Sequence, residues 1–245
     1  MMQPCSSSPA PVVFIGLDCV PLGLLERLRP KMPHMDSLLR QAAYGPLRSS
    51  TPPITVPAWA SMLSGRDAGE LGMYGFRSKV PGAYAMRLHD ARDMQHKRVW
   101  DWAAETGKRV AVVSVPLTWP PPAVRGQLVS SLLWPGKDAA WTHPPDLAQA
   151  LEAVHGPYRA DIDDFRREDS EAIWPALHSA LRQHFAIARD LWQNARPDLL
   201  LLVILATDRL HHRFWHRLDP AHPRYIPDHP DNARAEAFYQ ALDAE

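Results

Sequence analysis

Two acidic residues and a histidine stand where buried strands of this sequence are expected to end. Asp208 and His212 lie just beyond the most apolar run of the chain, Leu199–Ala206. If the chain turns helical there, residues four apart share one face, so both side chains can bind one metal ion. A second apolar run, Val12–Leu17, leads into Asp18. The pattern predicts a metal site assembled from two distant segments.

Other histidines and a simpler interpretation of the acids compete with this prediction. His211 neighbours His212 and is the alternative ligand. The pair Asp228-His229 has the right residue types, but it follows no apolar strand and lies among prolines, which favours a loop. An aspartate like Asp18 at the end of a strand, taken alone, is more often a turn or cap residue than a metal ligand.

A threonine in the segment 49–65 could supply a nucleophile. Pro57–Leu63 has the pattern of a short helix, and Thr55 stands just outside its first turn. A hydroxyl at a helix N-terminus faces unpaired N–H groups and the positive end of the helix dipole, where a phosphate group is stabilised. A divalent metal would activate the hydroxyl for attack. The alternative interpretation is an ordinary helix-capping threonine.

The elements that must position these residues alternate between strand and helix patterns, which is typical of an α/β doubly wound sheet. Predicted strands, the first of them buried on both faces of a parallel sheet, cover 12–17, 110–115, 127–133 and 199–206. Predicted helices cover 21–41 with a break near Pro30–Pro33, 57–63, 173–191 and 232–242. Residues 1–10 are predicted to be a disordered leader. Asp18 and Asp208 both fall at the carboxyl ends of strands, where sites in such sheets lie.

Composition narrows the class of protein. The 245 residues include 27 basic and 27 acidic side chains, so the absence of net charge argues against a nucleic-acid groove or binding to an anionic membrane. The two cysteines, Cys5 and Cys19, suggest neither a disulfide framework nor a zinc knuckle. The N-terminus lacks the basic region of a signal peptide, and no run reaches transmembrane length. A soluble, cytoplasmic protein is expected.

Four segments in order carry a resemblance to a known family. They are V-F-I-G-L-D-C, which contains Asp18; Y-G-P-L-R-S-S-T-P-P-I-T-V-P-A-W-A-S-M-L-S-G, which contains Thr55; V-W-D-W-A-A-E-T-G-K-R-V-A-V-V-S-V-P-L-T-W-P-P; and A-T-D-R-L-H-H-R-F-W-H-R-L-D-P, which contains Asp208 and His212. Together they resemble the alkaline phosphatase superfamily, in its type I phosphodiesterase/nucleotide pyrophosphatase branch. The resemblance implies an α/β, alkaline-phosphatase-like sandwich with a mostly parallel central sheet flanked by helices. Residues 11–245 would be its N-terminal portion, with the domain truncated at the C-terminus.

The resemblance also implies a site and a reaction. Asp18 and Thr55 would bind one divalent metal, and Asp208 and His212 a second. The metals are usually zinc in the family, with manganese or iron as alternatives for this donor set. Thr55 would attack phosphorus as the nucleophile and hydrolyse a phosphodiester or pyrophosphate bond in a small, nucleotide-like substrate.

The chain departs from the family pattern at several points. Ala58 replaces the asparagine of T-x-P-N, and Leu71 stands before Gly72 where a histidine is common. The later Asp-His pair and the still later histidine, which complete the two metal sites in the family, do not occur before Glu245. A missing C-terminal half is therefore an expected partner of this segment.

Two other classes of function remain open. The chain could be a truncated, non-catalytic remnant or the partner-dependent half of a split protein. It could also be a phosphomutase or sulfatase relative. Sulfatases need cysteine or serine in C/S-x-P-x-R, which the sequence around Thr55 does not supply, and mutases of the superfamily typically use serine at the nucleophile position.

Overall fold

Three apolar runs, Val12–Leu17, Val110–Val113 and Leu199–Ile204, form neighbouring parallel strands of the main sheet. The computed structural model describes residues 10–136, 138–162 and 170–245. Within them, a five-stranded sheet has the order β1-β7-β4-β5-β6 and is parallel except for the β5–β6 pair. Its strands are β1 (Val12–Leu17), β4 (Val110–Val113), β5 (Gly126–Val129), β6 (Thr142–His143) and β7 (Leu199–Ile204). The predicted leader lies outside the described residues apart from Ala10.

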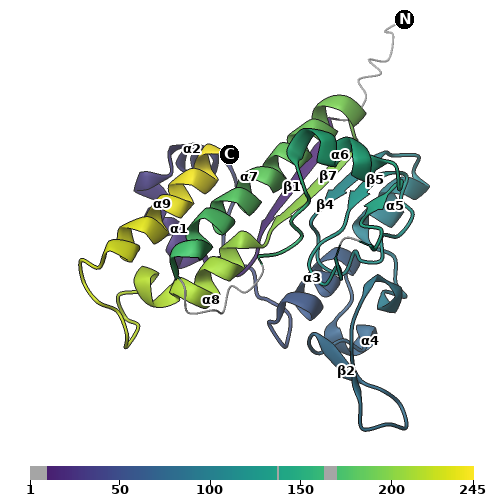
Figure 1. Cartoon of the computed structure of the whole chain (residues 1–245), viewed down its shortest axis with the longest axis horizontal. Helices are drawn as coiled ribbons and strands as arrows, with labels where there is room; N and C mark the ends of the chain where they lie inside the picture. The colour runs from purple at the N-terminus through teal and green to yellow at the C-terminus, as the bar shows by residue number, and fades with distance from the viewer. Residues whose placement is uncertain (1–9, 137, 163–169) are drawn as a thin grey trace, which may run out of the picture.

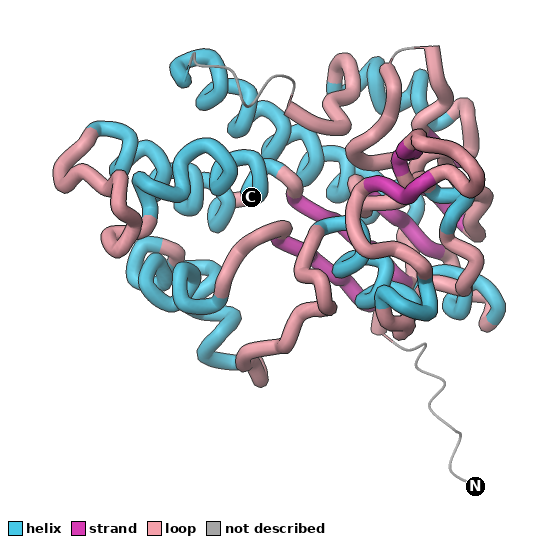
Figure 2. Tube along the Cα trace, turned by 90° about the horizontal axis from the view of Figure 1, so that it is seen from below, coloured by secondary structure: helices cyan, strands magenta, loops and turns pink. Residues whose placement is uncertain are grey.

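Helices cover both faces of this sheet (Figures 1 and 2). The helices are α1 (Leu22–Leu28), α2 (Pro33–Gln41), α3 (Thr55–Ser64), α4 (Ala68–Leu71), α5 (Val99–Glu105), α6 (Leu147–His155), α7 (Ser170–Ala195), α8 (Ala206–Leu218) and α9 (Pro230–Ala244). Two 3₁₀ turns, Arg29–Lys31 and Ala91–Asp93, and a hairpin of β2 (Arg77–Lys79) and β3 (Met86–Leu88) complete the described chain.

The side chains of each strand alternate between the two faces of the sheet, so the hydrophobic core has two layers. In β4, Ala111 and Val113 join the cluster that contains the buried face of α7, together with residues of α1, α8 and α9. Val110 and Val112 join the opposite cluster, which contains side chains of α3 and α5. Because successive strand residues point to opposite faces, one apolar run fills both layers. The result is the predicted α/β sandwich with a mostly parallel central sheet.

Most predicted elements are confirmed, with shifted ends. The predicted break near Pro30–Pro33 separates α1 from α2, where Pro33 occupies the first turn of the second helix. The strand predicted over 127–133 ends at Val129, and the strand predicted over 199–206 ends at Ile204 because Ala206 already begins α8. None of the described helices has the length and apolarity needed to cross a membrane.

The prediction that β1 is buried on both faces is wrong. β1 is an edge strand that pairs only with β7 in the described sheet. The side chains of Val12, Val13 and Ile15 are 58%, 47% and 51% exposed. A run of apolar residues does not reveal whether a strand is central or at an edge, so the sequence pattern could not distinguish these positions.

Candidate active site

The two predicted acidic ligands meet because their strands are neighbours. Leu17, the last residue of β1, pairs with Ile204, the last residue of β7, and the Asp18 amide donates to the Ile204 carbonyl at 3.2 Å. The Thr207 hydroxyl then bonds the Asp18 carbonyl at 2.8 Å. Asp208 follows directly, so both carboxylates lie at the carboxyl edge of the sheet, as the sequence predicts.

The helical turn after β7 is also confirmed. α8 begins at Ala206, which places Asp208 in its first turn and His212 one turn later on the same face. His212 Nε2 lies 3.5 Å from Asp208 Oδ1. Asp208 is buried, whereas the His212 side chain is 51% exposed and faces a cavity.

Thr55 is brought to Asp18 from a distant segment. Its Oγ1 donates to Asp18 Oδ2 over 3.3 Å. α3 begins at Thr55 itself, so the expectation that Thr55 stands outside the helix is wrong by two residues; Ile54 is the N-cap and has no side-chain capping bond. The hydroxyl therefore sits at a helix N-terminus whose first amides are not capped by a side chain, a suitable place for a phosphate group.

Trp59 completes the surroundings of Asp18. Its indole Nε1 donates to Asp18 Oδ1 at 3.2 Å, on the carboxylate oxygen that Thr55 leaves free. Trp59 lies four residues after Thr55, so the two side chains share one face of α3. Trp59 was not among the predicted site residues, although its spacing from Thr55 could have indicated this contact.

Burial changes the acidity of Asp18. The pKa of Asp18 is raised to about 6, mainly because the carboxylate is removed from water and secondly because the Asp208 charge is near. The hydrogen bonds from Trp59 and Thr55 act in the opposite direction. Two carboxylates held together in a partly buried place repel each other. A site of this kind favours binding a cation between them.

Arg209 balances part of this negative charge. Its guanidinium bonds both oxygens of Asp161 at 2.6 Å and reaches Asp208 Oδ2, also at 2.6 Å. The bond from Arg209 holds Asp208 Oδ2, whereas Asp208 Oδ1 faces Cys19 and His212. No pattern in the sequence links Asp161 to this site, and the sequence analysis missed it.

His211 and His229, the histidines that compete with His212 as metal ligands, have other partners in the structure. His211 uses both ring nitrogens, Nδ1 with the Cys19 carbonyl at 3.0 Å and Nε2 with the Tyr239 hydroxyl at 2.6 Å. Burial lowers the pKa of His211 to about 4, so the ring is neutral near pH 7. His229 is the N-cap of α9 and accepts from the Asp231 amide, consistent with its rejection as a ligand.

Two cavities open at this edge of the sheet. The larger, about 1380 Å³, is lined by Asp18, Trp59, Ala58 and the Ser49–Thr51 segment, and it extends along β1. The smaller, about 320 Å³, is lined by Asp208, His211, His212 and Trp215, and Cys19 and Pro21 line both. Among the described residues, no three His, Cys, Asp or Glu side chains are already gathered as a closed metal cluster.

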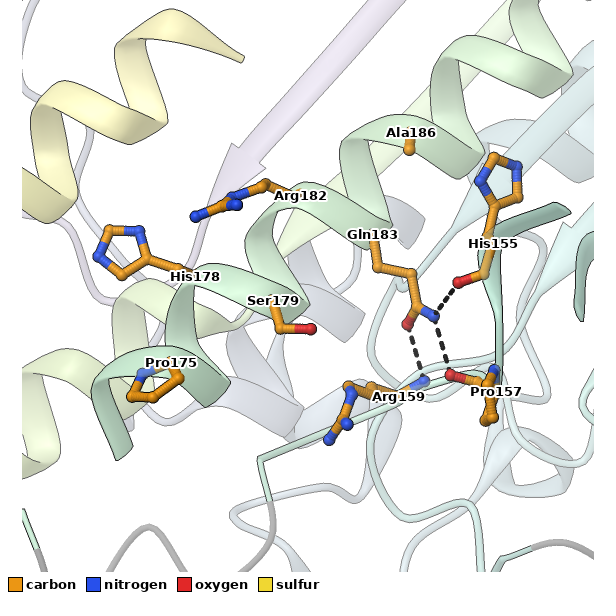
Figure 3. Close-up of a pocket in the computed structure, with 9 residues that line it drawn as sticks. All are labelled: His155, Pro157, Arg159, Pro175, His178, Ser179, Arg182, Gln183 and Ala186. Atoms are coloured by element: carbon orange, nitrogen blue, oxygen red, sulfur yellow. Dashed lines mark hydrogen bonds between the residues drawn. The ribbon is translucent and has the colours of Figure 1, made fainter. Parts of the chain in front are cut away.

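A third cavity, of about 640 Å³, lies along α7 (Figure 3). The Gln183 amide, on α7, bonds the carbonyls of His155 and Pro157 and accepts from the Arg159 amide. His155 also pairs with Asp190 at 2.9 Å. These bonds hold α7 against the end of α6, and none of the predicted site residues lines this cavity.

The sequence matches the family model described as type I phosphodiesterase / nucleotide pyrophosphatase over residues 12–245. The chain belongs to this family. The match covers nearly all of the chain and includes every predicted site residue, so the resemblance of the four segments is confirmed. No curated protein matches the sequence.

Solved structures of similar fold include two of phosphonoacetate hydrolase from Sinorhizobium meliloti 1021. The complex with phosphonoformate has a TM-score of 0.59 and 16% sequence identity; the complex with phosphonoacetate has a TM-score of 0.56 and 15% identity. Each alignment covers 96% of this chain and 52% of the hydrolase. At this identity the likeness establishes the fold, and the chain spans about half the length of these neighbours.

Proposed function

We propose that this family member acts in the metal-dependent hydrolysis of phosphodiester or pyrophosphate bonds, with Thr55 as the nucleophile. The observation that carries the proposal is the bond from Thr55 Oγ1 to Asp18 Oδ2 at an uncapped helix N-terminus. Family membership supports the phosphoester class of reaction. A small phosphodiester or nucleotide-like substrate would bind in the cavity beside Asp18.

The donor set fits divalent cations. Asp18 and Thr55 offer oxygen donors from β1 and α3, and Asp208 with His212 offer oxygen and nitrogen donors from α8. Burial of Asp18 close to Asp208 leaves a negative charge that a cation would neutralise. When bound, two divalent metals would stabilise the alkoxide of the nucleophile and the charge on the phosphoryl oxygens.

The chain's own residues set up the attack. Asp18 orients the Thr55 hydroxyl, whose hydrogen points at Oδ2 and whose lone pairs remain available for phosphorus. Attack forms a bond between Thr55 Oγ1 and phosphorus and breaks the bond to the leaving oxygen, while the hydroxyl proton passes to solvent and the leaving oxygen takes a proton from solvent. The first amides of α3 can hold the phosphoryl oxygens meanwhile. Water then cleaves the phosphothreonine ester and restores the hydroxyl.

A second candidate function is a partner-dependent half of a larger site. Its supporting observation is that, among the described residues, no three His, Cys, Asp or Glu side chains are gathered to hold a metal ion. In this case metal would bind weakly and hydrolysis would require a second polypeptide segment.

The test is hydrolysis of bis(p-nitrophenyl) phosphate with added zinc or manganese, comparing wild type with Thr55→Ala and Thr55→Ser. Loss of the hydroxyl should lower kcat/KM by more than roughly a thousandfold, since no other group replaces a nucleophile, whereas serine should retain part of the rate. Thr106→Ala is the control, because Thr106 is exposed at the end of α5 and lines neither cavity of the site.

Equal rates for wild type and Thr55→Ala would contradict the assignment of the nucleophile. A wild-type chain that binds zinc but does not hydrolyse the diester would instead support the partner-dependent half.

A further inference from the structure

Cys19 places a thiol in the smaller cavity of the site, beside the predicted ligands Asp208 and His212. The Cys19 backbone has a left-handed conformation, with φ of 64°, at the turn that follows β1. Its Sγ donates to Asp208 Oδ1 at 2.8 Å, across 189 positions of the sequence. The thiol is thus held in contact with a predicted metal ligand.

Three donor atoms of different chemistry line this cavity, although in the metal-free chain they are not gathered around one point. Asp208 Oδ1 lies 2.8 Å from the Cys19 sulfur and 3.5 Å from His212 Nε2. Ligands of one tetrahedral zinc ion stand about 3.3–3.7 Å apart, given metal bonds of about 2.0–2.3 Å. A shared ion would therefore move the sulfur back by roughly half an ångström and draw in the half-exposed His212 ring.

We propose that Cys19 is a third protein ligand of the metal held by Asp208 and His212. This inference rests on the proposed function, because it adds a ligand to one of its two metals. On binding, the sulfur–hydrogen bond breaks, a sulfur–metal bond forms and the proton passes to solvent. The thiolate and the Asp208 carboxylate then match the charge of a divalent cation, while the His212 ring binds as a neutral donor.

The other polar groups around the cavity do not replace the thiol. His211 is already bonded through both nitrogens, to the Cys19 carbonyl and to Tyr239. Asp208 Oδ2 is engaged by Arg209. The Cys19 sulfur therefore becomes available to a metal once its single hydrogen bond to Asp208 Oδ1 is broken.

A thiolate ligand also selects the metal. Cysteine favours zinc over manganese, which prefers carboxylate and water oxygens. The set Cys19, Asp208 and His212 consists of sulfur, oxygen and nitrogen donors, and zinc accepts all three in tetrahedral sites. Of the metals that the sequence leaves open, the position beside α8 is then a zinc position.

Cobalt(II) titration of the full chain tests the inference without an activity readout. All proteins carry Cys5→Ser, so that Cys19 is the single thiol. Wild-type Cys19 should give both visible d–d bands and a near-ultraviolet thiolate-to-cobalt charge-transfer band. Cys19→Ser should lose the charge-transfer band and weaken zinc binding by more than about tenfold, the loss that follows removal of even a supporting group.

The variant Cys19→Gly tests whether any loss of metal binding in Cys19→Ser is caused by misfolding. Glycine adopts a left-handed backbone without the cost that other residues incur, so this variant removes the sulfur while relieving the turn. It should retain the fold by circular dichroism and show the same loss as Cys19→Ser. Zinc should also slow alkylation of Cys19 by iodoacetamide several-fold, and Asp208→Asn should abolish that protection.

The outcomes separate the two proposals. Cobalt d–d bands without a charge-transfer band, unchanged by Cys19→Ser, would overturn the role of Cys19 and leave the site of Asp208 and His212 standing. No cobalt spectrum at all would overturn both the Cys19 ligand and the metal site beside α8 in this chain.

Discussion

The Trp59 indole and the Asp18 carboxylate are joined by a hydrogen bond of 3.2 Å, although they lie 41 positions apart. Because Thr55 bonds the other oxygen of the same carboxylate, α3 contacts Asp18 with two side chains one turn apart. α3 therefore holds Thr55, the predicted nucleophile, next to the Asp18 carboxylate.

Removing the indole donor should raise the pKa of Asp18 above its value of about 6, since the bond from Trp59 opposes the upward shift. Trp59→Phe keeps an aromatic ring in the core but deletes the N–H group. The carboxyl signal of Asp18, identified by its absence in Asp18→Asn, can be followed by carbon-13 NMR during a pH titration of metal-free protein. Trp102→Phe, at a half-exposed tryptophan of α5, is the control and should leave this titration unchanged.

The close approach of Gly16 to Trp59 should make the strand next to the site intolerant of a side chain. A Cβ atom at Gly16 would lie 2.3 Å from Trp59 Cη2, closer than two such atoms can approach without a shift. Gly16→Ala should therefore lower the free energy of unfolding by about 1–3 kcal/mol, the usual cost of overpacking. Gly45→Ala, with nothing within 4 Å of the added atom, is the matched control.

Urea unfolding measures this effect directly. A Gly16→Ala protein as stable as Gly45→Ala would show that the ring moves aside without cost, and that Trp59 is not fixed by β1.

Asp18 should make the stability of the metal-free chain depend on pH. Its pKa is about 6 in the folded protein against an ordinary value of 3.8, so the folded state binds the proton more tightly. Relative to Asp18→Asn, the wild type should keep its full stability below pH 4 and lose it as the pH rises through 6. The pKa difference corresponds to a loss of at most about 3 kcal/mol.

The comparison requires urea unfolding of both proteins in a chelator between pH 4 and pH 7. His211 has the opposite effect, because its lowered pKa of about 4 removes stability as the pH falls, and subtraction of the two proteins cancels it. A difference between the two proteins that stays constant over this range would show that Asp18 is ionised throughout.

The sequence located the acids of the site but not their surroundings. Asp18 and Asp208 are visible because each follows an apolar strand, and parallel strands bring their carboxyl ends to one edge. Cys19 is adjacent to Asp18, yet its contact with Asp208 depends on a left-handed turn that its residue type does not predict. The Asp161 contact with Arg209 depends on the tertiary fold alone.

The hydrophobic pattern of the sequence also could not predict the order of the strands in the sheet. The residues of β1 are as apolar as those of a central strand, and only the strand pairing shows that β1 has a neighbour on one side alone within the described residues. The prediction of a buried strand failed for this reason.

The edge strand β1 should promote self-association of the chain. Alternate residues of a strand direct their backbone groups to opposite sides, and the amides of Val12 and Asp18 bond on the β7 side. The groups of Val13 and Ile15 therefore face the open side, beside side chains that are half exposed. Unpaired backbone with apolar side chains is a template for a further strand.

Ile15→Lys should suppress this association, because a charge on an edge strand opposes pairing with another chain. Sedimentation velocity over a range of protein concentrations should show larger species for the wild type and mainly monomer for the variant. Val154→Lys, at an apolar residue of α6 that is 70% exposed, adds the same charge away from β1 and should behave as the wild type. Equal suppression by both substitutions would attribute the effect to net charge and not to the open edge of β1.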